Sequence, residues 1–316
     1  VAPRGMLLFD RLPVHEVDVL VERGEERSDG RRPVLQVVVH RDRGGVPCCA
    51  DAGEQCGVLT EVARHLDSVH PVIVRSEAAA ELARSPAAVS AALRREARHG
   101  SVGLLRNGFH VLVPPEHRAV GSPPASWFVD ELMQFLGQPY YVGLLTAAAL
   151  HGAGHQQPMV FQVVTDRQTR PIVLGRLRIE FHQRRRIDDA AVASMATETG
   201  TMRVATAEAT AFDLVHHQDA VGSIVRVGEV LDELCERLDP VALADCATRA
   251  ATPDVQRLGF LLEFLSEREL AVPLSRVLEE RRVRAVRLAT GGVLRPGAEL
   301  DPRWRIVKNW SPEPSQ

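Results

Sequence analysis

The sequence of 316 residues contains a single lysine, Lys308, so arginine carries almost all of its positive charge. Any mechanism that needs a catalytic lysine before position 308 is therefore excluded. No apolar run approaches the roughly 18 residues that span a membrane, and the start of the chain lacks the pattern of a secretory signal. We expect a cytoplasmic protein that does not contact a membrane.

Cysteine is also scarce, and its spacing does not favour a metal site. Cys48, Cys49 and Cys56 lie close together, but C-C-x6-C does not supply the paired ligands of a zinc knuckle. Cys235 and Cys246 lie in helical patterns and are expected to be small buried residues. The cysteines therefore predict no bound metal.

Two histidines, His151 and His155, could place imidazoles on one helix face for zinc. Gly152 and Gly154 interrupt that helix, and no glutamate lies between the histidines as a general base. No glycine-rich phosphate loop is present. We therefore expect no metal, no cofactor and no enzymatic activity.

The composition is that of a globular protein with room for two domains, since 45% of the residues are apolar and 25% are charged. Strands are grouped ahead of helices, which favours an α+β fold over a regular βαβ repeat. We expect a winged helix-turn-helix at 58–115, a linker at 116–126 and a larger mixed domain at 127–316. Residues 1–57 hold one plausible strand, at 34–40, and are interpreted as a poorly ordered extension or as misassigned upstream sequence.

Segment 76–113 has the pattern of a winged helix-turn-helix. Ser85 and Pro86 form a helix cap followed by proline at the first helical position, and the helix should end at Gly100. Asn107-Gly108 is the strongest short hairpin signal. Two more helices are expected, at 59–66 and from Ser76 to about Arg84.

The helix that begins at Pro86 has two distinct faces. Its predicted core positions are Val89, Ala92, Leu93 and Ala97, at helical spacing. Small residues and arginines on the other face would let the helix enter a major groove and contact phosphates. The alternative is a small helical subdomain with a solvated arginine face. The predicted DNA-binding residues are Arg84, Ser90, Arg94, Arg95, Arg98 and Arg106.

A second basic segment lies at 166–186, which contains seven arginines and only two acidic residues. It could be ordinary solvated surface or a surface for anions or nucleic acid. Residues 187–267 are acidic, with fifteen Asp and Glu against five Arg, and are not a DNA face. The predicted basic surface of the larger domain consists of Arg167, Arg170, Arg176, Arg178, Arg184, Arg185 and Arg186.

In the larger domain we expect helices at 127–136, 141–151, 207–215, 221–237, 240–250 and 255–265. Strands are expected at 160–165, 172–174, 178–182 and 202–204, followed by an extended tail after Gly291.

Several stretches in this order resemble the AbiEi antitoxin family. They are residues 108–115, the run from Tyr140 to Gly152, residues 157–167, 170–172 and 175–176, the run from Ala205 to Leu214, and residues 256–263. The similarity extends over about 59–310. No single motif decides it, and residues 1–57 have no counterpart in the family.

The resemblance implies an antitoxin of a type IV (abortive infection, phage defence) toxin–antitoxin system. Its winged helix would repress its own operon by binding promoter DNA, and its C-terminal domain would counteract a nucleotidyltransferase toxin. Direct binding of the toxin is not implied. The alternative is an interaction module whose winged helix binds a partner protein.

Overall fold

The computed structural model describes residues 19–22, 36–39, 72–74, 78, 85–154, 159–187, 190–291 and 298–309. The chain divides into two compact units, 1–56 and 57–316. In the first unit, β1 (Val19–Glu22) pairs antiparallel with β2 (Gln36–Val39). β2 confirms the strand predicted at 34–40, whereas β1 was not predicted.

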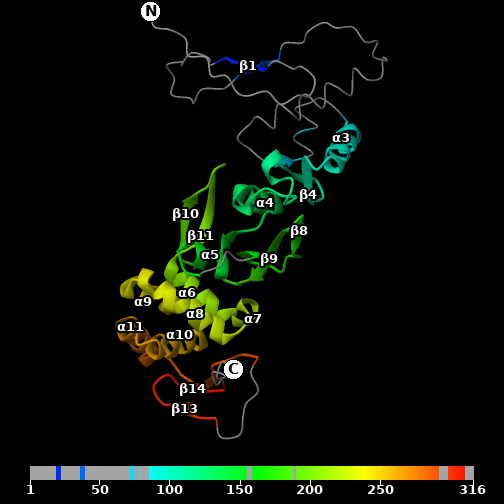
Figure 1. Ribbon diagram of the computed structural model, residues 1–316. Coiled ribbons are helices and arrows are strands. Elements are labelled where there is room, and N and C mark those ends of the chain that lie inside the picture. The colour runs from blue at the N-terminus through cyan, green and yellow to red at the C-terminus, as the bar shows by residue number, and fades with distance from the viewer. Residues whose placement is uncertain are drawn as a thin grey trace, which may run out of the picture. The chain divides into compact units, whose positions relative to one another are not determined.

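The second unit begins with a small sheet and one helix. Strand β3 (Val72–Val74) pairs with β5 (Phe109–Leu112), which pairs with β4 (Val102–Arg106), all antiparallel. Helix α3 (Pro86–Arg98) lies beside this sheet (Figure 1). Both α3 and the β4–β5 hairpin confirm the sequence predictions, and β3 was not predicted.

A six-stranded mixed sheet follows, in the order β10-β11-β6-β7-β9-β8. Strands β7 and β9 are parallel neighbours, as are β6 and β11, and the other neighbours are antiparallel. The bounds are β6 (Tyr140–Val142), β7 (Phe161–Thr165), β8 (Ile172–Leu174), β9 (Leu177–Gln183), β10 (Val192–Ala196) and β11 (Thr201–Ala205).

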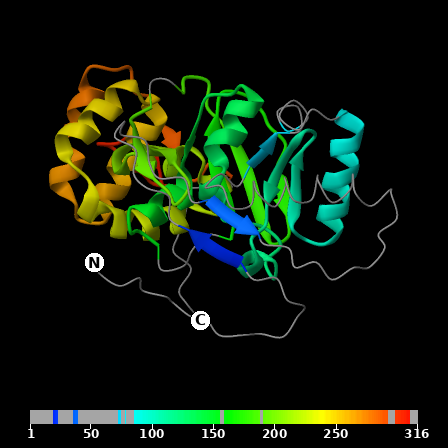
Figure 2. The same cartoon turned by 90° about the horizontal axis from the view of Figure 1, so that it is seen from above.

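Helices pack against this sheet and against one another. Helices α8 to α11 lie together to one side of the sheet (Figure 2), and α10 packs on both α6 and α11. The bounds are α4 (Val129–Leu136), α5 (Leu144–Leu150), α6 (Ala207–His216), α7 (Gln218–Val221), α8 (Ile224–Leu234), α9 (Pro240–Arg249), α10 (Thr252–Phe264) and α11 (Arg268–Glu279).

The chain continues in three short strands, β12 (Val286–Arg287), β13 (Leu300–Asp301) and β14 (Ile306–Val307), in the order β12-β14-β13. Trp304 precedes β14 and is 1% exposed. Its ring packs directly on the backbone of Gly259 in α10, where a Cβ atom would have no room. Helix and strand together confirm the predicted α+β class.

The described elements depart from the predicted ones in identifiable places. The helix expected at 141–151 begins at Leu144, because Tyr140 to Val142 pair with β7 as a strand. The helix expected at 221–237 is broken at Gly222, whose φ is 115°, and Ser223 caps α8. Strand β10 and helix α11 were not predicted. The helix predicted at 59–66 lies outside the described residues, and of the one predicted at 76–84 only Ala78 is described, in a helical conformation.

Both faces of the small sheet carry buried side chains. One face packs on α3, through a cluster that includes Val89, Leu93 and Leu112. The other contributes to the core of the larger sheet through Leu105, Phe109 and Val111, and the ring of Phe109 lies 5.2 Å from that of Phe135 in α4. The β4–β5 hairpin therefore contributes side chains to two hydrophobic cores.

The predicted linker contacts the larger sheet as well. It contains two single turns of 3-10 helix, η1 (Pro115–His117) and η2 (Ala125–Trp127). Between them, the Val120 carbonyl accepts a hydrogen bond from the Arg176 amide at 2.9 Å. Gly175, in the β8–β9 turn, has φ 56°, and a Cβ atom there would collide with Val120.

We predict that Gly175→Ala destabilises the second unit by about 1–3 kcal/mol. Alanine disfavours the left-handed backbone conformation at this position, and its Cβ atom would also collide with the backbone of Val120. Gly200→Ala is the control, since its Cβ would meet nothing within 4 Å. Urea unfolding of the full chain measures both. Equal midpoints for the two variants would show that the contact of Gly175 with Val120 does not stabilise the fold.

Candidate functional site

Helix α3 is positioned by its cap and by its apolar face. The Ser85 hydroxyl accepts a hydrogen bond from the Ala88 amide at 3.3 Å, and Pro86 stands in the first turn. Val89 and Leu93 are buried, as predicted. Ala97 is exposed, so its assignment to the core was wrong. It lies in the last turn of α3, where its side chain no longer packs against the core.

The opposite face of α3 carries its arginines. Arg94 and Arg98 are exposed and Arg95 is half-buried, and within the described residues none of them has a carboxylate partner. The Ser90 hydroxyl donates to the Pro86 carbonyl at 2.7 Å, which leaves it free only to accept. Arg84 lies outside the described residues. Basic groups therefore dominate the open face of α3.

Arg106, at the hairpin, is half-buried and donates to the backbone carbonyl of Arg170. Burial, and then the charge of Arg170, lower the pKa of the Arg106 guanidinium. The contact brings residues from the two predicted basic sets side by side. It also uses part of the hydrogen-bonding capacity of Arg106 within the protein.

Five of the seven arginines of 166–186 lie in strand β9 or next to its ends, and Arg167 and Arg170 lie between β7 and β8. Arg176 and Arg178 lie at its start, and Arg178 pairs with Glu180 at 2.7 Å. Arg184 follows its end, about 25 Å from Arg176 at roughly 3.3 Å per residue. The register of β7 and β9 pairs Thr165 with Gln183, so Arg167 lies near the Arg184 end.

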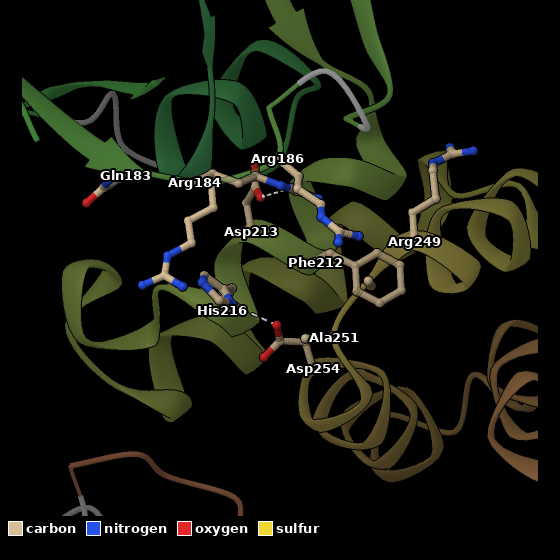
Figure 3. Close-up of a pocket in the computed structure, with 11 residues that line it drawn as sticks. Gln183, Arg184, Arg186, Phe212, Asp213, His216, Arg249, Ala251 and Asp254 are labelled. Carbon is tan, nitrogen blue, oxygen red and sulfur yellow. Dashed lines mark hydrogen bonds and ion pairs between the residues drawn. The ribbon is translucent and has the colours of Figure 1, made fainter. Parts of the chain in front are cut away.

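At the end of β9, a pocket of about 430 Å³ opens between the sheet and the helices (Figure 3). Arginines come from the β9 end and from α9, and acidic groups come from α6 and α10. Its lining includes Gln183, Arg184, Arg185, Arg186, Phe212, Asp213, His216, Arg249 and Asp254.

The innermost contact of this pocket is an ion pair. Arg184 Nη1 donates to Asp213 Oδ1 at 2.8 Å and to the Tyr141 hydroxyl at 3.2 Å. Asp213 is 1% exposed. Burial raises the pKa of the Asp213 carboxyl, and the Arg184 guanidinium opposes that shift. Because the carboxyl is so buried, Arg184 has a structural role as well as a place in the basic set.

A second ion pair at the pocket joins α6 to α10. His216 Nδ1 lies 2.7 Å from Asp254 Oδ2, and Arg257 Nη1 lies 3.2 Å from Asp254 Oδ1. The hydrogen bond to Asp254 raises the pKa of His216, while burial opposes it. The next residue, His217, is partly buried beside His216 and His182. Burial, and then the charges of those two histidines, lower its pKa to about 3. His216 can therefore carry a proton where His217 stays neutral.

Residues 141–264 match the family described as the AbiEi antitoxin C-terminal domain. Residues 141–264 form an AbiEi antitoxin domain. This confirms the family predicted from the sequence. Both ion pairs of the pocket lie within the AbiEi domain, and Tyr141 is the first residue of the match.

No curated protein matches the chain. Among solved structures it is similar to the RV2827C protein from Mycobacterium tuberculosis, with a TM-score of 0.56 and 16% sequence identity. The similarity covers 79% of this chain and 89% of that protein. At this identity it shows a shared fold.

The residues considered for metal binding lie elsewhere or are engaged. Cys48, Cys49, Cys56 and His155 are outside the described residues, and His151 Nε2 lies 2.7 Å from the Ala205 carbonyl. Within the described ranges, no group of three or more His, Cys, Asp or Glu could hold a metal ion. In the same part of the chain, no helix is long and apolar enough to cross a membrane.

Sequence reasoning missed both ion pairs of the pocket. The signal for Asp213 was available, because it lies between apolar residues in the run from Ala211 to Val215, where an acid is costly unless paired. Its partner was counted among surface arginines. Nothing in the spacing of His216 and Asp254 indicated that they meet.

We predict that Arg184→Met destabilises the second unit by about 3–5 kcal/mol at neutral pH, because it leaves the Asp213 carboxylate buried without a counter-charge. Without Arg184 the pKa of the Asp213 carboxyl rises further. At a pH above this raised pKa, the folded variant must hold a buried carboxylate, which lowers its stability. The deficit therefore shrinks as pH falls and the carboxyl takes up a proton.

The matched control is Arg178→Met, which removes an exposed arginine from its pair with Glu180 and should cost less than about 1 kcal/mol. Urea unfolding between pH 5 and pH 8 compares the two variants. A deficit for Arg184→Met that equals the control, or that grows toward low pH, would contradict the assigned role.

Proposed function

We propose that this chain is the antitoxin and transcriptional autorepressor of a type IV toxin–antitoxin operon for phage defence. Residues 58–115 would form a winged helix domain that binds the operon's own promoter. Residues 116–126 would connect it to an antitoxin domain at 127–316, which counteracts a nucleotidyltransferase toxin. The proposed protein is cytoplasmic and is not an enzyme.

The observation that carries the DNA-binding part is the open face of α3. Its buried side packs on the small sheet, which leaves Arg94, Arg95 and Arg98 directed away from the core without carboxylate partners in the described residues. The exposed alanines Ala87 and Ala91 precede them. Small residues followed by arginines allow close approach to a groove together with phosphate contacts.

Hydrogen bonds within the protein change the roles that we propose for individual residues. Because the Ser90 hydroxyl already donates to the backbone, base readout would depend on Arg94 and Arg95, which can donate to guanine. Arg106 would contribute its remaining N–H groups while it holds the hairpin to Arg170. Arg84 stays in the proposed set on its sequence position alone.

The antitoxin part is supported by the AbiEi match. Within that domain, Arg184 is committed to Asp213, so the proposed basic surface depends on the more exposed members of the set. Neutralisation need not involve a stable complex with the toxin. The proposed surface residues are Arg167, Arg170, Arg176, Arg178, Arg185 and Arg186.

The test is an electrophoretic shift of a fragment of the chain's own promoter by the full-length protein. Wild type should bind with an affinity that falls steeply with salt. Arg94→Ala/Arg95→Ala should abolish the shift, because it removes both arginines proposed to read base edges.

The charge-matched control is Arg268→Ala/Arg276→Ala, which removes two exposed arginines from α11. It should bind like wild type. Unchanged binding by Arg94→Ala/Arg95→Ala would refute the assignment of α3. Association with a protein that is insensitive to salt, without any DNA shift, would favour the interaction module instead.

A further inference from the structure

We propose that the pocket at the end of β9 binds a phosphate-bearing small molecule of nucleotide size. Its phosphate would lie between Arg185, Arg186 and Arg249, with His216 as a further donor. This goes beyond the proposed function, which needs no small ligand.

The charge of the pocket is the first argument. Its carboxylates are already engaged, because Asp213 pairs with Arg184, and both oxygens of Asp254 are taken by His216 and Arg257. Arg185 and Arg186 are exposed and have no partner within the described residues. Arg249 pairs with Asp245 at 2.8 Å, so the unpaired positive charge in the described part of the pocket belongs to Arg185 and Arg186. Guanidinium groups suit phosphate through paired N–H donors, and Arg249 would contribute its remaining ones.

The α9–α10 junction favours an anion for a second reason. The carbonyl end of α9, which would repel an anion, is covered by Arg281, which donates to the carbonyls of Ala247, Thr248 and Ala250. The amide end of α10 begins at the pocket wall, where Ala251 supplies no capping side chain. The partial positive charge of that end adds to the arginines.

His216 would make binding depend on pH. Its Nδ1 is engaged by Asp254, while half of its side chain is exposed on the pocket side. Its charged or titratable surroundings are Asp213, Asp254, Arg184 and the neutral ring of His217. Asp254 favours the protonated ring, which offers a second N–H to a phosphate oxygen.

Size and position separate the pocket from a duplex-binding surface. About 430 Å³ is within the range of small-molecule sites and exceeds the need of an inorganic ion. Phe212, Ala250 and Ala251 supply apolar wall for the rest of the ligand. The pocket is concave and lies at the far end of β9 from Arg176. The phosphates of a DNA duplex would instead contact basic residues on an exposed, outward-facing surface.

The experiment is isothermal titration of the full chain with inorganic phosphate, adenosine monophosphate and adenosine, at pH 6 and pH 8. We expect adenosine monophosphate to bind, phosphate to bind at least tenfold more weakly, and adenosine not to bind. The ratio of the affinity at pH 6 to that at pH 8 should be larger for wild type than for His216→Gln, because the phosphate, whose second pKa is about 6, titrates alike with both proteins.

Arg186→Met/Arg249→Met should weaken adenosine monophosphate binding at least tenfold, whereas Arg268→Met/Arg276→Met should leave it unchanged. Circular dichroism reports whether each variant is folded. No binding of either phosphate compound by wild type, or equal binding by the two double variants, would overturn the proposal.

A promoter shift with the same variants separates this proposal from the proposed function. The pocket variant should still bind the promoter. Loss of the shift together with loss of nucleotide binding would mean that the pocket belongs to the DNA surface, and would overturn the small-molecule assignment. Loss of DNA binding by the α3 variant alone does not bear on nucleotide binding in the pocket.

Discussion

The pairing of Arg184 with Asp213 is the contact on which the AbiEi domain depends. It joins the end of β9 to α6, and through the Tyr141 hydroxyl it also joins β6. An acid that is 1% exposed requires such a partner. The pair fixes where β9 ends relative to the helices, and thereby where Arg185 and Arg186 emerge beside His216. The pocket is a consequence of that junction.

A second constraint concerns the small sheet. A free wing would expose one face, but here Leu105, Phe109 and Val111 enter the core of the larger sheet while Leu112 packs toward α3. The contact of Gly175 with Val120 reinforces this connection. If α3 binds a promoter as proposed, the AbiEi domain is carried in a defined orientation, so its exposed arginines would meet DNA or a partner from a set direction.

Much of the fold could be predicted from local chemistry. Ser85 with Pro86 predicted α3, Asn107 with Gly108 predicted the hairpin, and the ordered stretches from Tyr140 onward predicted the family. Long-range pairing could not be read in the same way. Arg184 looked like one of seven surface arginines, because nothing near it in sequence shows that Asp213 lies opposite. His216 and Asp254 likewise meet only because α6 packs on α10.

The central claim, that the AbiEi domain makes this chain an antitoxin, is tested most directly by co-expression with the proposed nucleotidyltransferase toxin. The measurement is growth of cells that produce this toxin with wild type or with Arg94→Ala/Arg95→Ala, both expressed from a foreign promoter so that autorepression has no effect. We predict that both restore growth, because we propose that the C-terminal domain neutralises the toxin and that α3 does not take part. Failure of folded wild-type protein to restore growth would contradict the account.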